Sequence, residues 1–256
     1  MNVQTFYDQL TPFYQLIYPN WETSMQQQAQ TLTGIIRDLW GDRIETVLDV
    51  ACGIGTQALG LAQHGFTVTA SDLSPQAITR ARQEAASRQL KLDFSVADMQ
   101  IAFRHHRRQF DLVIACDNAV PHLLTDTDIL TAFRQFYHCT RPGGGCLISV
   151  RDYARGERGG VQVKPYGLRQ EGSRRYLVFQ VWEFHGEIYE LAMYFVQDEG
   201  GVDCTTHVMR THYYAVTIDK LMALLAQAGF EQVQRVDDRF FQPVIVGQKP
   251  DSDSLC

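Results

Sequence analysis

Four aspartates follow short apolar runs of the sequence, and their carboxylates could act on one ligand together. They are Asp49, Asp72, Asp98 and Asp117. If the runs are parallel strands, their carboxyl ends meet at one edge of a sheet, which is where open α/β sheets bind ligands. One such aspartate alone could be a helix cap, but four in the same position predict a shared polar crevice. The apolar runs are 46–50, 66–71, 92–96 and 110–115.

The loop after the first run contains Gly53-x-Gly55, and Ala58 and Asp72 complete an approximate dinucleotide-binding fingerprint. An NAD-dependent dehydrogenase is therefore one interpretation. Charge favours another, because Asp49 stands directly before the loop and would repel a pyrophosphate at the following helix N-terminus. A ligand with positive charge fits this position better. S-adenosylmethionine, with an ammonium and a sulfonium group, is such a ligand.

The sequence predicts how the parts of this methyl donor are held. Asp72 can accept hydrogen bonds from both ribose hydroxyls, and Asp98 can accept one from the adenine amino group. Met99 and Ile54 supply apolar contacts. The predicted cofactor-binding residues around the crevice are Asp49, Ala51, Gly53, Gly55, Asp72, Leu73, Asp98, Met99 and Asp117.

Strand-like and helix-like patterns alternate from residue 46 to residue 150. Ser74-Pro75 opens one of the helices, with Ser74 as the N-cap and Pro75 in the first turn. This alternation predicts an α/β fold: a Rossmann-like, doubly wound, mostly parallel seven-stranded sheet with helices on both faces. Besides the four runs above, the expected elements are helices at 56–64, from 75 and at 126–139, a loop at Arg141–Gly145, and a strand at 146–150.

The pattern changes after Val150. Residues 151–173 are rich in Gly and Arg and are expected to form a loop, and three antiparallel strands with Gly-containing turns follow. We expect an inserted antiparallel lid at 151–215, which would bind the acceptor, and a cofactor domain at 1–150 and 216–250 whose N-terminal arm and helix occupy 1–40. The remaining expected elements are strands at 175–183, 187–197 and 204–214, a helix at 217–228, strands at 230–236 and 243–248, and a frayed tail at 250–256.

Composition excludes several classes of protein. The chain has 256 residues, of which 45% are hydrophobic and 20% charged, and a net charge of −6. These values are typical of a globular protein and argue against a disordered or fibrous chain and against extended nucleic-acid binding. No run approaches the roughly 20 apolar residues of a membrane span, and the N-terminus has no secretory pattern. We expect a cytoplasmic protein that binds neither nucleic acid nor membrane; the oligomeric state is left open.

No metal site is predicted. Six scattered cysteines without a C-x-x-C pair argue against a zinc cage and a disulfide framework. The basic run Arg104–Arg108 includes two adjacent histidines but has no carboxylate or cysteine partners, so we interpret it as a solvated surface segment. A hydrolase is not supported either, because no serine lies in a G-x-S-x-G motif.

The runs VLDVACGIG, ASD, VADM and RPGG together resemble class I S-adenosylmethionine-dependent methyltransferases, over about residues 20–150. A narrower resemblance is to the glycine N-methyltransferases and glycine/sarcosine N-methyltransferases. It rests on Asn118 and His122 in DNAVPHL, on Arg151 in RDY, and on the tyrosine pair in RTHYY. The sequence departs from the vertebrate enzymes at Asp98-Met99 and through much of 154–200, which affects the acceptor more than the donor.

The resemblance implies that Arg151 grips the carboxylate of an amino-acid acceptor and that aromatic residues close the site. Arg151 would use a fork-like bidentate pair, although a solvated or salt-bridged arginine is the alternative. His122 is an acceptor contact or proton acceptor, or else a loop histidine bonded to the backbone. Asn118 holds a ligand by its amide or caps the local turn.

Aromatic residues complete the predicted site, with core packing as the alternative for each. Tyr213 or Tyr214 matches the lid position of the family, and Tyr18 and Trp21 resemble its N-terminal arm residues near the donor. Tyr194 is a further candidate for the acceptor pocket. Aromatic faces suit a sulfonium or an ammonium group.

The sequence thus predicts methyl transfer from S-adenosylmethionine to a small acceptor that carries a carboxylate, favoured as the amine of glycine, sarcosine or a similar amino acid. Three alternatives stay open. They are a methyltransferase for the oxygen or nitrogen of another small metabolite, an NAD-dependent oxidoreductase, and a regulatory protein that only senses S-adenosylmethionine.

Overall fold

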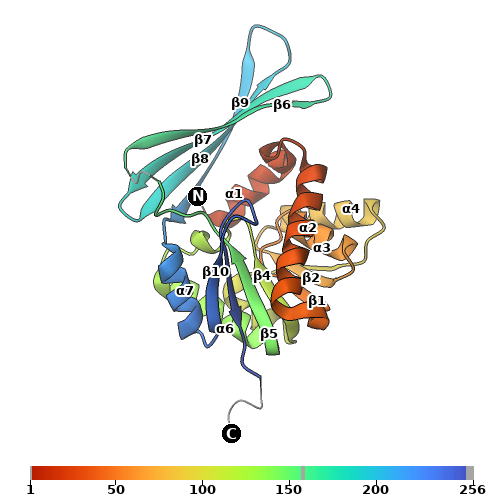
Figure 1. Ribbon diagram of the computed structural model, residues 1–256. Coiled ribbons are helices and arrows are strands. Elements are labelled where there is room, and N and C mark those ends of the chain that lie inside the picture. Colours follow the sequence, from red (N-terminus) through yellow and green to blue (C-terminus); the bar gives the residue numbers. More distant parts are fainter. Residues whose placement is uncertain (1, 157–158, 252–256) are drawn as a thin grey trace.

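The computed structural model describes residues 2–156 and 159–251, which form two β-sheets with helices around the larger one (Figure 1). The large sheet has seven strands in the order β10-β11-β5-β4-β1-β2-β3, and only β10 and β11 run antiparallel to their neighbours. This confirms the predicted mostly parallel, doubly wound sheet. Its strands are β1 (Thr46–Asp49), β2 (Thr67–Asp72), β3 (Asp93–Val96), β4 (Phe110–Ala115), β5 (Thr140–Ser149), β10 (Glu231–Val236) and β11 (Val244–Gln248).

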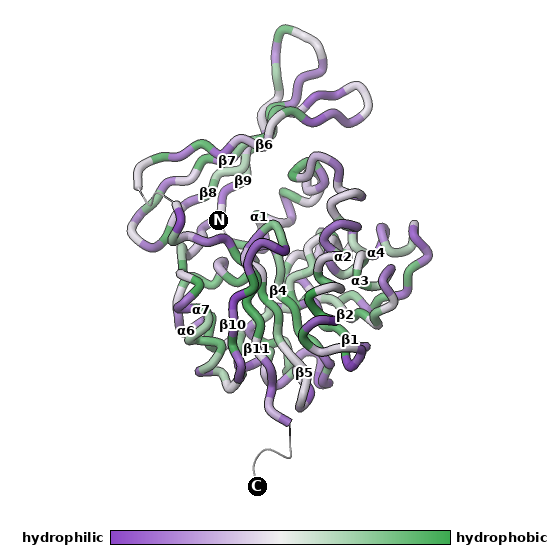
Figure 2. The backbone as a smooth tube through the Cα atoms, in the orientation of Figure 1, coloured by the Kyte–Doolittle hydropathy of each residue, from purple (hydrophilic) through white to green (hydrophobic). Residues whose placement is uncertain are grey.

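Helices cover both faces of the large sheet because its central strands are apolar on both sides. In β4, Leu112 and Ile114 pack into the core beneath α2, α3 and α4, whereas Val113 faces α6 and α7. Figure 2 shows the central strands as predominantly hydrophobic. Near-continuous apolar strands of this kind belong to sheets that are buried on both faces. The helices are α2 (Trp21–Trp40), α3 (Thr56–Gln63), α4 (Pro75–Ser87), α5 (Ala102–His106), α6 (Asp126–Cys139) and α7 (Ile218–Gln227), with short 3₁₀ turns η2 (Gly41–Arg43), η3 (Met99–Ile101) and η4 (Val120–His122).

The predicted start of α4 is confirmed. Ser74 Oγ accepts a hydrogen bond from the Ala77 N–H at 3.0 Å, and Pro75 occupies the first turn. The Ser74 hydroxyl also donates to Asp8 Oδ1 at 2.5 Å, so the helix cap is joined to the N-terminal segment.

The loop predicted at Arg141–Gly145 is wrong, because β5 begins at Thr140 and includes these residues. Glycine serves here as a strand residue that allows close approach. A Cβ on Gly145 would overlap the ring of Trp40 from α2, and one on Gly144 would overlap the Asp111 carbonyl oxygen of β4.

The small sheet is antiparallel and contains β6 (Val161–Glu171), β7 (Arg174–His185), β8 (Ile188–Asp198) and β9 (Cys204–Tyr214), in that order. The three predicted strands correspond to β7, β8 and β9. The loop predicted at 151–173 is wrong over 161–171, where β6 forms the edge of the sheet. A register shift between Pro165 and Gly167 interrupts its pairing with β7, which hides the strand pattern in the sequence.

The N-terminal segment fills the space between the two sheets (Figure 1). The ring of Phe13 stacks on Phe195 of β8 at a centroid distance of 5.0 Å. Arg169 Nε of β6 donates a 3.0 Å hydrogen bond to the Tyr18 carbonyl oxygen. The N-terminal segment therefore contacts the small sheet through aromatic packing and through a hydrogen bond. Its elements are α1 (Val3–Leu10) and the 3₁₀ helix η1 (Thr11–Ile17).

Within residues 2–156 and 159–251, no helix combines the length and hydropathy needed to cross a membrane. The predicted frayed tail at 250–256 lies mostly outside the described residues, since the description ends at Asp251. Cys256 lies outside it too. The other five cysteines are free, and Cys52, Cys116, Cys139 and Cys146 among them are buried.

Candidate active site

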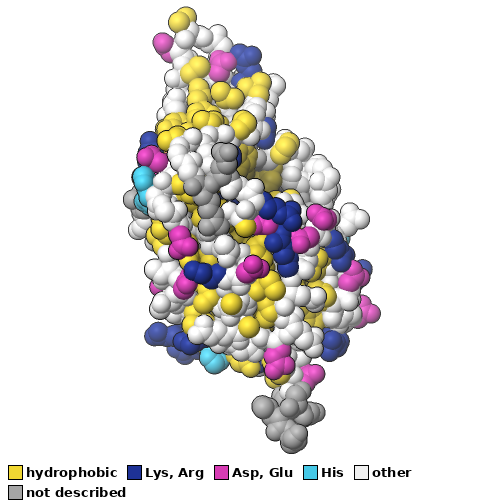
Figure 3. All heavy atoms as spheres, turned by 60° about the vertical axis from the view of Figure 1, so that its left-hand side comes forward, with side chains coloured by type: hydrophobic (Ala, Val, Ile, Leu, Met, Phe, Trp, Pro, Cys, Tyr) yellow, Lys and Arg dark blue, Asp and Glu magenta, His cyan; other side chains and the backbone are white. Residues whose placement is uncertain are grey.

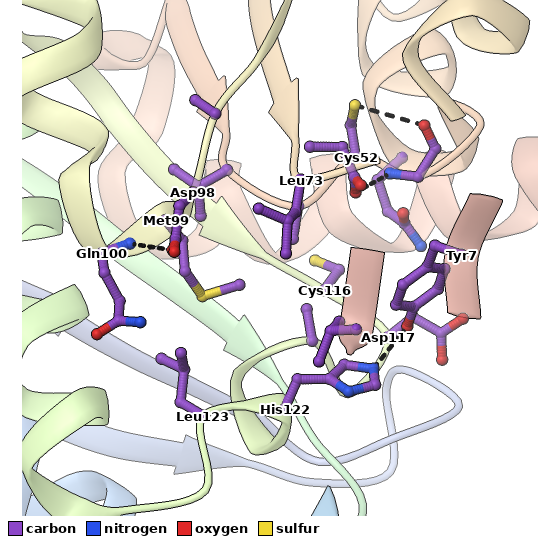
Figure 4. A pocket seen from close by; sticks show the side chains of 18 of the residues that line it. Tyr7, Cys52, Leu73, Asp98, Met99, Gln100, Cys116, Asp117, His122 and Leu123 are labelled. Atoms are coloured by element: carbon purple, nitrogen blue, oxygen red, sulfur yellow. Dashed lines mark hydrogen bonds between the residues drawn. The ribbon is translucent and has the colours of Figure 1, made fainter. Parts of the chain in front are cut away.

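A cavity lies at the carboxyl ends of β1, β2 and β4, where the sequence predicts the crevice (Figure 4). We call it the first cavity. Its walls come from the loops after these strands, from the segment after β3 and from α1 and η1 of the N-terminal segment. The predicted residues that line it are Ala51, Gly53, Asp72, Leu73, Asp98, Met99, Asp117 and His122.

The Asp72 carboxylate is held in one orientation by main-chain donors. Its Oδ2 accepts from the Gly53 N–H at 2.8 Å, and its Oδ1 accepts from the Ser74 N–H at 2.9 Å. Gly53 has a φ of +53°, and a Cβ there would meet Tyr14 Oη at 3.2 Å. Burial raises the pKa of Asp72 above its usual value, while the hydrogen bonds act in the opposite direction. A fixed acceptor is thus aimed at the cavity.

Asp49 lies behind the loop and does not line the cavity. The residue is fully buried, its Oδ1 accepts from the Ala51 N–H at 3.2 Å, and its Oδ2 has no hydrogen-bond partner among the described residues. Burial raises its pKa to about 7. The predicted carboxylate beside the loop is therefore present, with one oxygen unpaired.

The far end of the first cavity combines one acceptor with apolar walls. Asp98 Oδ1 accepts from the Gln100 N–H at 2.8 Å and so caps η3. Met99 follows on the same turn, and Leu73 lies on the neighbouring loop, both with side chains in view of the cavity in Figure 4. This arrangement suits a flat heterocycle with a donor at its edge.

Asp117 lies two residues beyond the end of β4 and has a left-handed backbone conformation, with a φ of +54°; Asn118 follows with a φ of +65°. Asp and Asn tolerate this conformation better than most residues. The Asp117 carboxylate accepts from Tyr18 Oη and from Gln242 Nε2, each at 3.1 Å. Burial raises its pKa above the usual value, and Arg151 opposes that shift.

A second cavity adjoins the first and lies beneath the small sheet. Asp117, Tyr7 and Tyr14 line both cavities, whereas Arg151 and Tyr213 line only the second. The remaining polar and aromatic wall is supplied by Tyr166, Gln180 and Phe6.

The Arg151 guanidinium is enclosed by aromatic rings. It lies 5.2 Å from the ring centroid of Trp182 and 5.8 Å from that of Tyr213. Its Nη1 is buried and has no hydrogen-bond partner within the described part of the chain. A buried, unpaired guanidinium nitrogen is costly unless an acceptor reaches it. The arrangement can therefore bind a carboxylate in the second cavity.

His122 stands at the border of the first cavity, in η4. Its Nε2 is 2.8 Å from Tyr7 Oη, and its ring lies 4.0 Å from that of Tyr213, centroid to centroid. Its Nδ1 is buried without a partner among the described residues. Burial lowers the pKa of His122 to about 3, so the imidazole is neutral at physiological pH.

Asn118 and Tyr18 act on the site indirectly. The Asn118 Nδ2 donates to Tyr153 Oη at 2.8 Å, and its Oδ1 accepts from the Arg151 N–H at 3.1 Å. Asn118 thus holds the backbone of Arg151 and does not line either cavity. Tyr18 does not line them either, although its hydroxyl fixes Asp117.

The other predicted residues point elsewhere. Trp21 Nε1 donates to Thr56 Oγ1 at 2.9 Å, and Gly55 is the N-cap of α3 with a φ of +99°. Tyr214 Oη donates to Asp126, and Tyr194 stacks on Phe179 on the opposite face of the small sheet from Met193. Of the tyrosine pair, only Tyr213 faces a cavity.

Sequence reasoning missed Tyr7 and Tyr14, which line both cavities. They lie on helical turns of the N-terminal segment, away from any strand end, so the pattern that located the aspartates does not reach them. The available signal was the density of aromatic residues among the first 21 positions.

Within the described residues, no group of three His, Cys, Asp or Glu side chains is placed to hold a metal ion. His105 Nε2 lies 2.9 Å from Ser95 Oγ, and His106 Nε2 lies 3.2 Å from Ser71 Oγ.

Comparison with known proteins agrees with this geometry. Residues 47–144 match the family described as "Methyltransferase domain". The glycine/sarcosine N-methyltransferase of Parasynechococcus marenigrum (strain WH8102) is 34% identical over 119 residues, which are 46% of this chain and 42% of that relative. The ubiquinone biosynthesis O-methyltransferase of Azoarcus sp. (strain BH72) is 32% identical over 104 residues, 41% of this chain and 43% of that relative. Each of these two matches thus spans less than half of this chain and less than half of the relative.

Among solved structures, the CcbJ methyltransferase from Streptomyces caelestis is similar in fold. It covers 98% of this chain and 100% of its own, with a TM-score of 0.77 and 18% identity. The antiparallel β11 between β5 and β10 also differs from the strand order 3-2-1-4-5-6 of dinucleotide-binding sheets, which sets the NAD-dependent alternative aside. Residues 47–144 of this chain thus match a methyltransferase domain, and the fold is shared with a solved methyltransferase.

Proposed function

We propose that this chain transfers a methyl group from S-adenosylmethionine to a small acceptor that carries a carboxylate, favoured as the amine of glycine, sarcosine or a similar amino acid. One observation carries the proposal: Asp117 lines both cavities, and the second cavity contains an unpaired arginine nitrogen. A donor in the first cavity and an acceptor in the second would therefore meet beside one carboxylate.

On the donor side, the fixed carboxylate of Asp72 would accept from the two ribose hydroxyls. Asp98 would accept from the adenine amino group, with Leu73 and Met99 against the ring faces. Asp49 has an unpaired, buried oxygen behind the Ala51–Gly53 loop, so a cationic amino-acid tail near that loop would favour its ionised form.

On the acceptor side, Arg151 would bind the carboxylate through Nη1. Tyr213 packs beside Arg151 and contacts His122, so it fixes one wall of the acceptor cavity. We propose residues 151–215 as the acceptor-binding layer, because the inward side chains of the small sheet line this cavity. Residues 1–150 and 216–250 are proposed as the cofactor domain.

When bound, S-adenosylmethionine supplies a methyl group on a sulfonium: the amine lone pair forms the N–C bond, the S–C bond breaks with its electrons left on sulfur, and the nitrogen gives up one proton. Since the donor is already activated, the protein contributes mainly alignment and exclusion of water. The position of the half-buried side chains of Tyr7, Tyr14 and Arg151 between the two sheets fits that task.

We assign the proton to Asp117. It lies where the two cavities adjoin, and burial raises its pKa, so it holds a proton more readily than an exposed aspartate. His122 fits this role less well, because its pKa is lowered to about 3. His122 and Tyr7 would instead shape the wall near the transferred group.

A second candidate is methylation of another small metabolite at oxygen or nitrogen. It is favoured by the nearly equal identity of the O-methyltransferase and N-methyltransferase relatives, 32% and 34%. The carboxylate of a phenolic acid could also accept a hydrogen bond from Arg151 Nη1.

Two measurements test the proposal. Calorimetric titration should show binding of S-adenosylmethionine and S-adenosylhomocysteine and no binding of NAD. A methyl-transfer assay should then show turnover with glycine or sarcosine, and less with the matched amines that lack a carboxylate. Turnover with phenolic acids alone would favour the second candidate, and absence of adenosyl-ligand binding would refute both.

A further inference from the structure

The middle rows of the outward-facing side of the small sheet are mostly apolar, and several of their side chains are exposed. Side chains alternate between the faces of a strand, and those of β7 and β8 that line the second cavity, such as Gln180 and Met193, point inward. The intervening residues therefore point outward. The pairing of β6 and β9 with these strands places their outward residues on the same face, where five hydrophobic side chains are well exposed: Val161 at 64%, Val163 at 62%, Leu168 at 63%, Leu177 at 48% and Val208 at 37%. We call the outward residues of β6–β9 the outer face.

The register of the sheet places apolar outward residues of the four strands side by side. We call a set of outward residues paired across the strands a row. Three neighbouring rows across the four strands contain one charged residue, Arg210. Hydrophobic side chains gather on the upper lobe of the molecule in Figure 3, which the small sheet forms. The rows are Val163, Val181, Ala192 and Arg210; Pro165, Phe179, Tyr194 and Val208; and Leu168, Leu177, Val196 and Thr206.

We infer that two copies of this chain pair through the outer faces of their small sheets. This inference does not depend on the proposed methyl transfer. A flat apolar sheet face is complementary to an identical face, and two sheets pack in this way about 10 Å apart. A two-fold axis through the contact would make it self-complementary and closed.

The area of the outer face is sufficient for a stable dimer. Four strands about 4.8 Å apart, with five outward rows about 6.8 Å apart, give a flat footprint of roughly 650 Å². Specific interfaces bury about 600–1,000 Å² on each partner. The three apolar rows make up roughly 390 Å² of this footprint and the two flanking rows form a polar rim. Contiguous exposed apolar patches of more than a few hundred Å² mark contact sites.

Charge and strand geometry exclude two other modes of contact. Arg210 pairs with Glu190 at 2.9 Å and Arg175 with Asp198 at 2.6 Å, so the rim offers no free cluster of cations for an anionic membrane. Pairing along the β6 edge is disfavoured because Pro165 has no N–H and the register shifts beside it. Contact through the outer face leaves the cavities on the opposite side of the small sheet open to their ligands.

Sedimentation velocity or light scattering over a micromolar concentration series tests the inference. The particle that the full chain forms in solution should have twice the 29.1 kDa mass of one chain. The double variant Val163→Lys/Leu177→Lys should dissociate at least about tenfold more readily. Val202→Lys is the matched control, because Val202 is also fully exposed but lies on the turn between β8 and β9, and it should behave as the parent chain.

A far-UV circular dichroism spectrum and a melting temperature equal to those of the parent chain verify that the double variant folds. A parent chain that stays monomeric across the series would overturn the inference. So would a folded double variant that dimerises as tightly as the parent chain.

Discussion

The main-chain N–H of Gly53 donates a 2.8 Å hydrogen bond to Oδ2 of Asp72, and this contact joins the loop after β1 to the end of β2. One carboxylate thus sets both the shape of the loop and the position of a ligand acceptor. Asp72→Ala should therefore weaken binding of S-adenosylhomocysteine by about 100-fold, since hydrogen bonds to a charged group contribute roughly 1.5–3 kcal/mol each. Titration calorimetry measures this, with exposed Asp93→Asn as the control. Equal affinity in the two variants would contradict the assignment.

Arg151→Met should separate acceptor binding from donor binding. Because Arg151 lines the second cavity and not the first, the KM for a carboxylate-bearing acceptor should rise at least about tenfold while the Kd for donor stays unchanged. Arg155→Met is the matched control, because its side chain is 71% exposed. If both variants kept the parent KM, Arg151 would not be the carboxylate ligand.

Asp117 and His122 should differ in the pH dependence of turnover. A general base must be ionised, so activity rises with pH through its pKa. Asp117→Asn should remove this rise, which is the acidic limb of the pH–rate profile, and should lower kcat about 100-fold or more. His122→Asn should retain the limb, because a residue with a pKa of about 3 is already neutral throughout the assay range. The reverse pattern would return the proton-accepting role to His122.

Asp49 should make the ligand-free protein less stable as pH rises. Its pKa is about 7 in the folded state and 3.8 as the reference value, so the folded protein keeps a proton that the unfolded chain loses between these values. The free energy of unfolding falls with pH across that window, by up to about 1.4 kcal/mol per unit. Asp49→Asn should flatten this dependence. Urea unfolding of both proteins at pH 5 and pH 8 measures it, and parallel slopes would argue against a protonated Asp49.

Gly60→Ala should destabilise the contact between α2 and α3. An added Cβ would lie 2.6 Å from the Ala29 Cβ and 3.1 Å from the Met25 carbonyl oxygen, so the helices must separate. Such overpacking costs about 1–3 kcal/mol, which exceeds the helix-propensity gain of about 1 kcal/mol. Denaturant unfolding should show a net loss. Gly201→Ala, with no atom within 4 Å of the added Cβ, should leave stability nearly unchanged.

The sequence predicts the large sheet well because its strands are buried on both faces and end at polar residues. Asp72, Asp98 and Asp117 were located by that rule, and all three line the first cavity. Edge positions carry a weaker signal. In β6, Lys164, Pro165 and Gly167 lower the strand propensity, and the register shift breaks the alternation, so the segment resembles a loop.

Tertiary contacts explain the remaining differences. Gly144 and Gly145 look like a turn in the sequence, but they belong to β5 because Asp111 and Trp40 occupy the space that side chains would need. The orientation of a side chain on a strand also depends on register, which is why Tyr213 faces a cavity and Tyr214 does not. No local pattern reports such long-range packing.

The N-terminal segment has a consequence for how the protein is made. The Arg169–Tyr18 hydrogen bond joins positions 151 residues apart, so this contact of the N-terminal segment cannot form until β6 has been synthesised. Strands β1–β5 of the large sheet precede β6 in the chain and can pair during that interval. Completion of the second cavity, whose wall includes Tyr166, Gln180 and Tyr213, is therefore a late event in biogenesis, and damage to the β6–β9 hairpins should first reduce activity.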